Sequence, residues 1–278
     1  MINSNVTKIN SSINLENTKD TKLSIQFNLD GFSFCISDNS TGEILYFFKN
    51  LFEDKQTTPE NLMQKVDAIF KKDAFLQKDF SSVLVVHENN LSTLVPNKYF
   101  SEDKLLEYLN FNIKTLATDY IAFDDVPKIN AKNVYVPYIP INNYLFQNFG
   151  AFEYKHHTTI FIEKLLSLSS SEEKKVYVNV SSKSFDVVVI QNKKLQFSNS
   201  FEFETKEDFI YYILFTFEQL NLDVEKVKLY FTGDIELESE IYNSTYQYIR
   251  NVFFLESNNS IFNTIHYSKH SNYILLGS

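Results

Sequence analysis

The chain has 278 residues, which is enough for one large domain or two linked domains with a sizeable hydrophobic core. Its 27 Phe and 17 Tyr, with no Trp, favour β-strands and broad buried faces, so we expect sheet throughout. A net charge of −9 without a basic stripe argues against nucleic acid as a partner, and no apolar run approaches the ~18 residues of a membrane span, which argues against membrane insertion.

The first residues of the chain are polar. Residues 1–21 are rich in Asn, Ser, Thr and Lys and lack the apolar centre of a signal peptide, so we predict a disordered lead and a cytoplasmic protein. The single cysteine, Cys35, lies in an alternating apolar run, which predicts a buried strand residue. One thiol can form neither an internal disulfide nor a cysteine zinc site.

A β-meander and a helix are the first regular elements. Residues 23–36 alternate apolar and polar side chains on either side of a short polar break, which predicts a β-hairpin. A third strand is expected over 44–48. Thr58 and Pro59 then mark the N-terminus of a helix with one apolar face. A short apolar strand over 82–86 closes the unit.

The stretch that follows mixes short helices and strands. We expect helices over 101–112, 141–149 and 159–168, and strands over 120–123 and 134–138. This predicts a small inserted subdomain over about residues 96–150, within a first lobe that extends over 22–172.

A second copy of the first pattern occupies the predicted second lobe, residues 173–278. Residues 176–189 match residues 23–36 without a gap, and the alternating apolar positions of the two segments coincide. A third strand over 195–197, a helix and a strand over 227–231 then follow in the same order.

The helix of this second copy is unusually apolar. Thr205 caps it, with Asp208 three residues on, in the manner of a capping box. Its apolar residues form a stripe too wide for a surface helix: Phe209, Ile210, Ile213, Leu214, Phe217 and Leu220. We therefore expect it to be buried between other elements.

The order strand, strand, strand, helix, strand thus occurs twice. A three-stranded meander, followed by a helix that crosses to a further strand, is the core of the ribonuclease-H-like unit. We predict an α/β fold of two tandem ribonuclease-H-like lobes that arose by internal duplication. The alternative is an unrelated α+β binding protein in which the similarity of the two stretches is accidental.

Two such units in tandem are the plan of the actin-like ATPase superfamily, which the chain resembles from about Leu23 onward. The resemblance is closest to the bacterial branch with the actin-related cell-division protein and the type IV pilus assembly ATPase-like protein. Residues 229–233 are similar to the strand that ends in the family's adenosine loop, and residues 270–277 to its final helix of small residues. The chain also looks like a member of an uncharacterised bacterial family, described as actin-like in fold and without assigned activity.

This resemblance implies a MgATP site in a cleft between the lobes. In the superfamily the first strand pair of each lobe carries an Asp-x-Gly turn. The aspartate positions Mg²⁺, and the glycine lets backbone N–H groups approach the phosphates. On the repeat alignment the aspartate positions hold Gln26 and Asn179, and the glycine positions hold Asn28 and Ser181.

The remaining positions of the implied site are altered as well. A shifted alignment would recruit Asp30, but it breaks the register of the alternating apolar residues. The adenosine loop keeps Gly233 but has Asp234 in place of a second glycine, where a carboxylate would crowd and repel a nucleotide. Asp186 lies where the family often has a polar residue, and it could equally be an outward strand residue. The chain has five glycines, none with the spacing of a phosphate loop.

We therefore interpret the nucleotide site as degenerate, with no catalytic residue, no metal ligand and no cofactor. Its vestigial positions are Gln26, Asn28, Asp30, Asn179, Ser181, Asp186, Gly233 and Asp234. Glu153, His156 and His157 have the spacing of half a metal site, but no third ligand is near in the sequence.

These features predict a pseudo-ATPase of unknown cellular role that acts as a non-catalytic scaffold or interaction module, with another protein as its partner. The alternative is an enzyme or switch that binds MgATP weakly at an unorthodox phosphate site. Asp30, Asp186 and Asp234 would then be the candidate metal ligands. Nucleotide affinity separates these two hypotheses, and the sequence specifies no oligomeric state.

Overall fold

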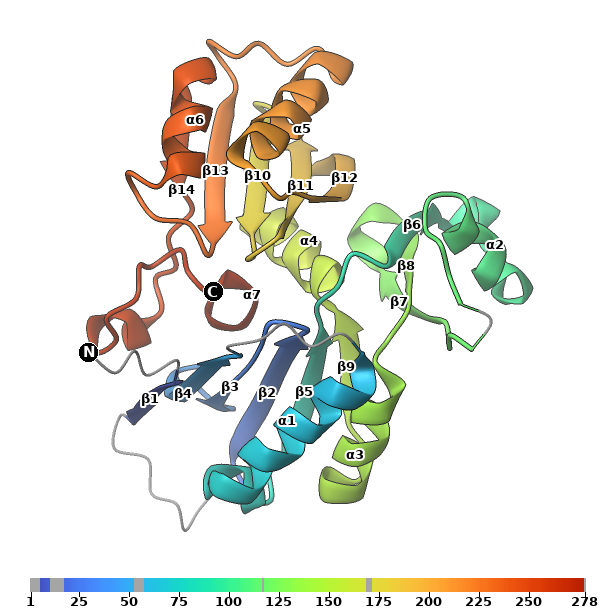
Figure 1. Cartoon of the computed structure of the whole chain (residues 1–278), viewed down its shortest axis with the longest axis vertical. Helices are drawn as coiled ribbons and strands as arrows, with labels where there is room; N and C mark the ends of the chain where they lie inside the picture. The colour runs from blue at the N-terminus through green and yellow to red at the C-terminus, as the bar shows by residue number, and fades with distance from the viewer. Residues whose placement is uncertain (1–5, 11–17, 53–57, 117, 169–171, 278) are drawn as a thin grey trace.

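Two lobes and a small subdomain make up the molecule (Figure 1). The computed structural model describes residues 6–10, 18–52, 58–116, 118–168 and 172–277. Each lobe is built on a mixed β-sheet with helices packed against it, and the subdomain has a sheet of its own. The predicted α/β fold with two lobes is therefore confirmed.

The lower lobe in Figure 1 contains a six-stranded sheet with the order β1-β4-β3-β2-β5-β9. Its strands are β1 (Val6–Asn10), β2 (Thr21–Asn28), β3 (Gly31–Asp38), β4 (Ile44–Leu51), β5 (Ser82–His87) and β9 (Glu153–His156). Strands β2, β3 and β4 form the expected antiparallel meander, and β5 lies parallel to β2.

Both faces of this sheet are buried, because alternate side chains of a strand point to opposite faces. Phe34 and Phe48 belong to the core under the helices α1 (Pro59–Lys72) and α3 (Ile139–Phe149). Cys35 and Phe47 belong to the core between the lobes. The prediction that Cys35 is a buried strand residue is confirmed, since it is 2% exposed.

The upper lobe repeats the central part of this arrangement. Its sheet has the order β12-β11-β10-β13-β14, in which β10, β11 and β12 are antiparallel and β13 and β14 run parallel to β10. These strands are β10 (Lys175–Val180), β11 (Ser184–Gln191), β12 (Lys194–Glu202), β13 (Lys228–Gly233) and β14 (Asn251–Phe254), and the helices are α5 (Lys206–Gln219) and α6 (Glu240–Tyr248). Strands β12-β11-β10-β13 match β4-β3-β2-β5 in order and direction. Internal duplication as their origin stays a prediction.

The two lobes are joined by the helix α4 (His157–Leu168), which begins directly after β9. Phe161 and Leu165 of α4 are fully buried, in a core that also contains Tyr177 of β10 and Tyr273 of the short helix α7 (Tyr273–Leu276). Lys164 of α4 donates hydrogen bonds to the carbonyl oxygens of residues 273 and 277. Residues from both lobes thus pack around one connecting helix.

The subdomain lies beside both lobes and is built on a three-stranded sheet with the order β6-β8-β7. Its elements are β6 (Ser92–Pro96), α2 (Leu105–Asn110), β7 (Ala122–Val126) and β8 (Ala131–Tyr135). The subdomain also contains the short 3₁₀ helices Asn97–Tyr99, Glu102–Lys104 and Pro127–Ile129, and the lobes contain Phe75–Gln77 and Ser260–Asn263. The prediction of a subdomain over about 96–150 includes too much, because Ile141 and Leu145 of α3 are buried in the core of the lower lobe.

Two further expectations are corrected. Residues Val6–Asn10, within the predicted disordered lead, form β1, because the outer edge of β4 offers them backbone partners. The rest of the lead up to residue 17 lies outside the described residues. Helix α5 is not buried between other elements: Tyr211 and Phe215 are 60% and 43% exposed and stack on each other.

No helix among the described residues is long and apolar enough to cross a bilayer.

Candidate functional site

A small cavity lies between the lobes, at the carboxyl ends of β2, β5, β10 and β13. Ligands of α/β sheets bind at the carboxyl ends of parallel strands. The cavity has a volume of about 60 Å³, well below the ~300–1,000 Å³ typical of ligand pockets. Of the vestigial positions, the cavity brings together Gln26, Asn28, Asp30, Asn179, Ser181, Gly233 and Asp234. Asp186 does not line it, but it lines a second hollow together with Asn28, Asp30 and Ser181.

The strand pairing supports the residue equivalences inferred from the repeat. Gln26 of β2 pairs with Ser33 of β3, and Asn179 of β10 pairs with Asp186 of β11, at corresponding places in the two hairpins. Asp30 lies in the two-residue turn between β2 and β3. The shifted alignment, which would place Asp30 in the strand, does not fit this register.

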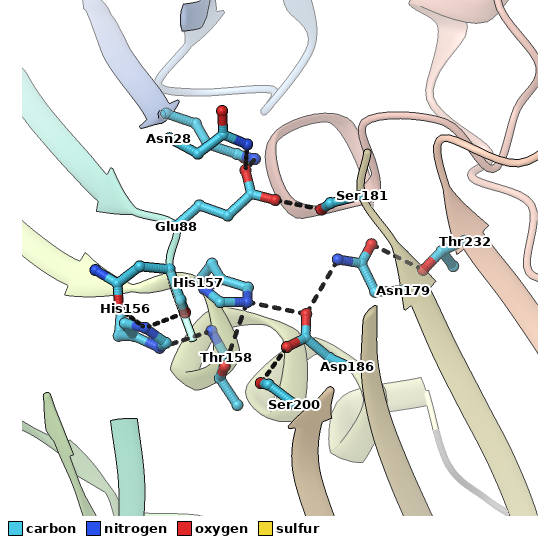
Figure 2. A network of polar contacts seen from close by, with 12 residues as sticks. Asn28, Glu88, His156, His157, Thr158, Asn179, Ser181, Asp186, Ser200 and Thr232 are labelled. Carbon is cyan, nitrogen blue, oxygen red and sulfur yellow. Dashed lines mark hydrogen bonds and ion pairs between the residues drawn. The ribbon is translucent and has the colours of Figure 1, made fainter. Parts of the chain in front are cut away.

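Glu88 is the central side chain of the cleft (Figure 2). Its backbone N–H donates to the Phe27 carbonyl at 3.1 Å, which continues the pairing of β5 with β2. Its carboxylate accepts hydrogen bonds from Gln26 Nε2 at 2.7 Å and Asn28 Nδ2 at 3.0 Å through one oxygen. Its other oxygen accepts from Ser181 Oγ of the upper lobe at 2.6 Å. One carboxylate therefore joins both lobes at the centre of the cleft.

These donors occupy the positions where the resemblance implies Asp-x-Gly turns. A phosphate group in the same place would have to displace Glu88 or lie against it, with like charges in contact. The chain's own carboxylate thus occupies the region expected for Mg²⁺ and the triphosphate.

Two further contacts bridge the lobes at the same cavity. Lys49 of β4 forms an ion pair with Asp234 at 2.8 Å, and the Lys49 side chain is 11% exposed. Ser182 donates a hydrogen bond from Oγ to the Asp30 carboxylate. The carboxylates of Asp30 and Asp234 are therefore both bonded to the opposite lobe.

The backbone geometry at residue 233 requires a glycine. Its φ of +87° lies in the left-handed region, and a Cβ at this position would be 2.2 Å from the Val180 carbonyl oxygen. The neighbouring Asp234 N–H donates to that same carbonyl at 2.7 Å. The close approach of β13 to β10 is thus sufficient to explain this glycine without a nucleotide.

Asp186 lines a hollow next to the cleft cavity and is 5% exposed, so it is not an outward strand residue. It accepts hydrogen bonds from Ser200 Oγ at 2.6 Å and Asn179 Nδ2 at 3.3 Å, and it pairs with His157 Nε2 at 2.9 Å. Burial alone would raise the pKa of Asp186, but the His157 charge holds it below its ordinary value. Burial likewise opposes protonation of His157, and the Asp186 carboxylate outweighs it and raises the pKa of His157. This ion pair fixes the first residue of α4 to the upper lobe (Figure 2).

The other two histidines near the cleft are buried and neutral. Burial lowers the pKa of His87 to about 3, and its ring nitrogens contact Asn142 Oδ1 at 3.0 Å and the Tyr138 N–H at 3.1 Å. Burial, reinforced by the His157 charge, holds the pKa of His156 well below its ordinary value. Within the described residues no group of three or more His, Cys, Asp or Glu side chains is placed to hold a metal ion.

Sequence reasoning missed Glu88 and Lys49. A signal for Glu88 was present, because it comes two residues after the strand predicted over 82–86, at an edge where such sheets place ligands. Lys49 had no comparable signal. It follows the predicted strand 44–48, and its partner Asp234 lies far away in the sequence.

Comparison with solved structures identifies the fold. The chain is similar to a Bacteroides thetaiotaomicron VPI-5482 protein with an actin-like ATPase fold and unknown function, with a TM-score of 0.82, 22% identity and coverage of 95% of this chain and 97% of that chain. It is also similar to a chain of the PilM–PilN type IV pilus biogenesis complex, with a TM-score of 0.60, 9% identity and coverage of 86% and 89%. The two lobes are therefore those of the actin-like ATPase fold, as the sequence predicted.

The family is shown by the sequence itself. No curated protein matches the chain. Residues 10–252 match a family described as a protein of unknown function, DUF3822, and this span covers most of the 278 residues. The suspected resemblance to an uncharacterised family with an actin-like fold is confirmed, and the chain belongs to the DUF3822 family.

Proposed function

We propose that this protein is a non-catalytic interaction module in which the actin-like cleft is closed by the protein's own side chains. The observation that carries the proposal is the Glu88 carboxylate, which Gln26, Asn28 and Ser181 hold between the lobes. In this proposal the module works in the cytoplasm, needs no nucleotide, and has another protein as its partner.

Energetics favours the closed cleft over a nucleotide. A hydrogen bond to a charged group contributes ~1.5–3 kcal/mol, and Glu88 accepts three of them. A nucleotide would have to replace these bonds and find counter-charge in the cleft. Lys49, which lines the same cavity, is already paired with Asp234. Binding of MgATP would therefore cost several existing contacts.

The alternative function, a MgATP-dependent enzyme or switch, has less support. Its candidate metal ligands Asp30, Asp186 and Asp234 are bonded to three different partners: Ser182, His157 and Lys49. Asp30 shares one hollow with Asp186 and another with Asp234, and neither of these hollows is lined by all three. A metal ion shared by the three would require each of these contacts to break.

The test is thermal unfolding of the full chain with and without millimolar MgATP, MgADP and Mg²⁺ alone. A ligand at 100 times its dissociation constant adds ~2.7 kcal/mol of stability, which is several degrees for most domains. We expect no shift with any of the three. A nucleotide-binding actin-like protein in the same assay serves as the positive control. A clear shift with MgATP would show that the cleft binds nucleotide and would overturn the proposal.

A further inference from the structure

A second hollow lies outside the cleft, between the subdomain and the upper lobe. Its volume is about 500 Å³, compared with about 60 Å³ for the cleft cavity, and it falls within the ~300–1,000 Å³ range of binding pockets. Residues 92–94 of β6 line one side of it, and residues 198–200 of β12 line another. We call this hollow the β6–β12 groove.

Both strands along the groove are sheet edges. Among the described strands, β6 pairs with β8 alone and β12 pairs with β11 alone. An edge strand presents a row of backbone N–H and C=O groups that can pair with another chain. Strand β12 contains no proline, and its charged residues, Lys194 and Glu202, stand only at its two ends. The usual devices that block an edge are therefore missing along the middle of β12.

The side chains around the groove indicate which ligand side chains it can bind. Leu91, Leu94 and Ile113 are half-buried and give it an apolar patch. Lys114 is exposed at the groove and makes no ion pair with any residue that the structure describes. Glu202 also lines the groove, and its carboxylate accepts a hydrogen bond from a neutral donor, Asn90 Nδ2, at 2.8 Å. The groove can therefore accept an apolar side chain and an acidic side chain beside a hydrogen-bonded backbone.

We propose that the β6–β12 groove binds an extended segment of a partner protein, which adds a strand to one of the two edges. Main-chain hydrogen bonds to an edge provide affinity, and pockets for alternate side chains provide specificity. The segment carries an apolar residue that packs on Leu91, Leu94 and Ile113 and an acidic residue that pairs with Lys114. This inference takes from the proposed function only that the partner is a protein, and it uses no property of the cleft.

A polypeptide fits these features better than other ligands do. Two edge strands at one hollow offer regularly spaced donors and acceptors, which complement a backbone at the ~4.8 Å spacing of paired strands. A nucleic acid would meet a protein of net charge −9.

The experiment selects peptides against the groove. A displayed library of random peptides of about 12 residues, roughly 40 Å when extended, is selected on the full chain. Binding is then measured to Ser198→Trp, in which the indole fills the groove, and to Gln196→Trp as the matched control. Gln196 is exposed on the same strand but does not line the groove. We expect selected peptides to bind the wild type and Gln196→Trp equally, and Ser198→Trp at least about tenfold more weakly, a loss of ~1.4 kcal/mol.

Backbone N-methylation of a selected peptide gives a second readout. Only alternate amides of an added strand point toward the edge, so methylation is expected to abolish binding at every second position and not at the positions between. Peptides that bind Ser198→Trp as well as the wild type, or a library that yields no groove-dependent binder, would overturn the proposal. If Ser198→Trp does not fold, Thr93→Trp on the opposite side replaces it.

Sedimentation of the wild type and of Ser198→Trp tests whether the groove instead binds a second copy of this chain. A wild-type dimer that Ser198→Trp abolishes would assign the groove to a second copy of this chain and would overturn the assignment to a partner. The nucleotide assay remains independent: a MgATP shift together with groove-dependent peptide binding would contradict the closed cleft but leave the groove in place. If MgATP gives no thermal shift and no groove-dependent peptide is selected, the closed cleft is supported and the groove is contradicted.

Discussion

The buried histidines near the cleft couple protonation to folding. Burial lowers the pKa of His87 from 6.5 to about 3, and the pKa of His156 also falls well below 6.5. Below pH 6.5 the unfolded chain binds protons that the folded chain does not, so acidification lowers the free energy of unfolding. We expect a loss of ~1.4 kcal/mol per pH unit for each histidine. Urea unfolding between pH 7.5 and pH 5 measures this slope, and His87→Gln should remove ~1.4 kcal/mol per pH unit from it.

A carboxyl group near these histidines acts with the opposite sign. Burial raises the pKa of Asp124 from 3.8 to about 6, although hydrogen bonds from Thr159, His156 and Tyr135 oppose the increase. Its stabilising contribution is complete below pH 3.8 and is lost as the pH rises through 6. In Asp124→Asn the acid-induced loss of stability should therefore be steeper than in the wild type.

The exposed His266 provides the control for the two buried histidines, His87 and His156. A changed slope in His266→Gln would contradict the assignment of the slope to these two residues.

At the scale of elements, the close approach of β13 to β10 makes Gly233 a sensitive position. Gly42 has a similar positive φ, +72°, but an added Cβ there would have no atom within 4 Å. Gly42→Ala should therefore cost only the left-handed conformation, ~1–2 kcal/mol. Gly233→Ala adds the overlap with the Val180 carbonyl, and we expect a loss of roughly 3–5 kcal/mol. Chemical denaturation of both variants tests this, and equal losses would refute the role of the close approach.

Elements whose causes are local could be predicted from the sequence. The hairpins β2–β3 and β10–β11 follow from period-two alternation, and the observed register agrees with the gapless repeat. Thr58 accepts a hydrogen bond from the Asn61 N–H, and Thr205 forms a capping box with Asp208, because caps depend on neighbouring residues.

Elements whose causes lie far away in the sequence were missed. Strand β1 forms because it pairs with the outer edge of β4, and the sequence of residues 6–10 does not indicate that partner. The predicted burial of α5 was wrong, because the predicted stripe left out Tyr211 and Phe215, which are exposed and stack on each other on the outer side of the helix. Glu88 and Lys49 are single polar residues whose importance comes from side chains on the opposite lobe.

At the scale of the whole molecule, the proposed closed cleft makes Glu88 the side chain to test. Glu88→Ala leaves the groups of Gln26, Asn28 and Ser181 without their acceptor, which should cost ~1–3 kcal/mol or more. It also removes a tie between the lobes. We expect small-angle scattering to give a larger radius of gyration for Glu88→Ala than for the wild type.

Two variants make this result specific to the cleft. Glu88→Gln keeps the size of the side chain and should give a smaller change than Glu88→Ala. Glu60→Ala removes an exposed carboxylate on α1 and should leave the radius unchanged. Identical scattering from Glu88→Ala and the wild type would mean that other contacts, such as the pair of Lys49 with Asp234, hold the lobes together.

The Glu88 carboxylate also constrains how this fold can evolve. Restoring an aspartate at residue 26 alone would place a second carboxylate beside Glu88, whose oxygen is now 2.7 Å from the Gln26 amide. Losing Glu88 alone would leave the polar groups around it without their acceptor and would still provide no glycine near the phosphates. If the proposed closed cleft is correct, neither of these two single substitutions alone would create a nucleotide site. Under that proposal a descendant of this chain would need several substitutions at once to bind ATP, and each of the two argued here would be disfavoured when it occurs alone.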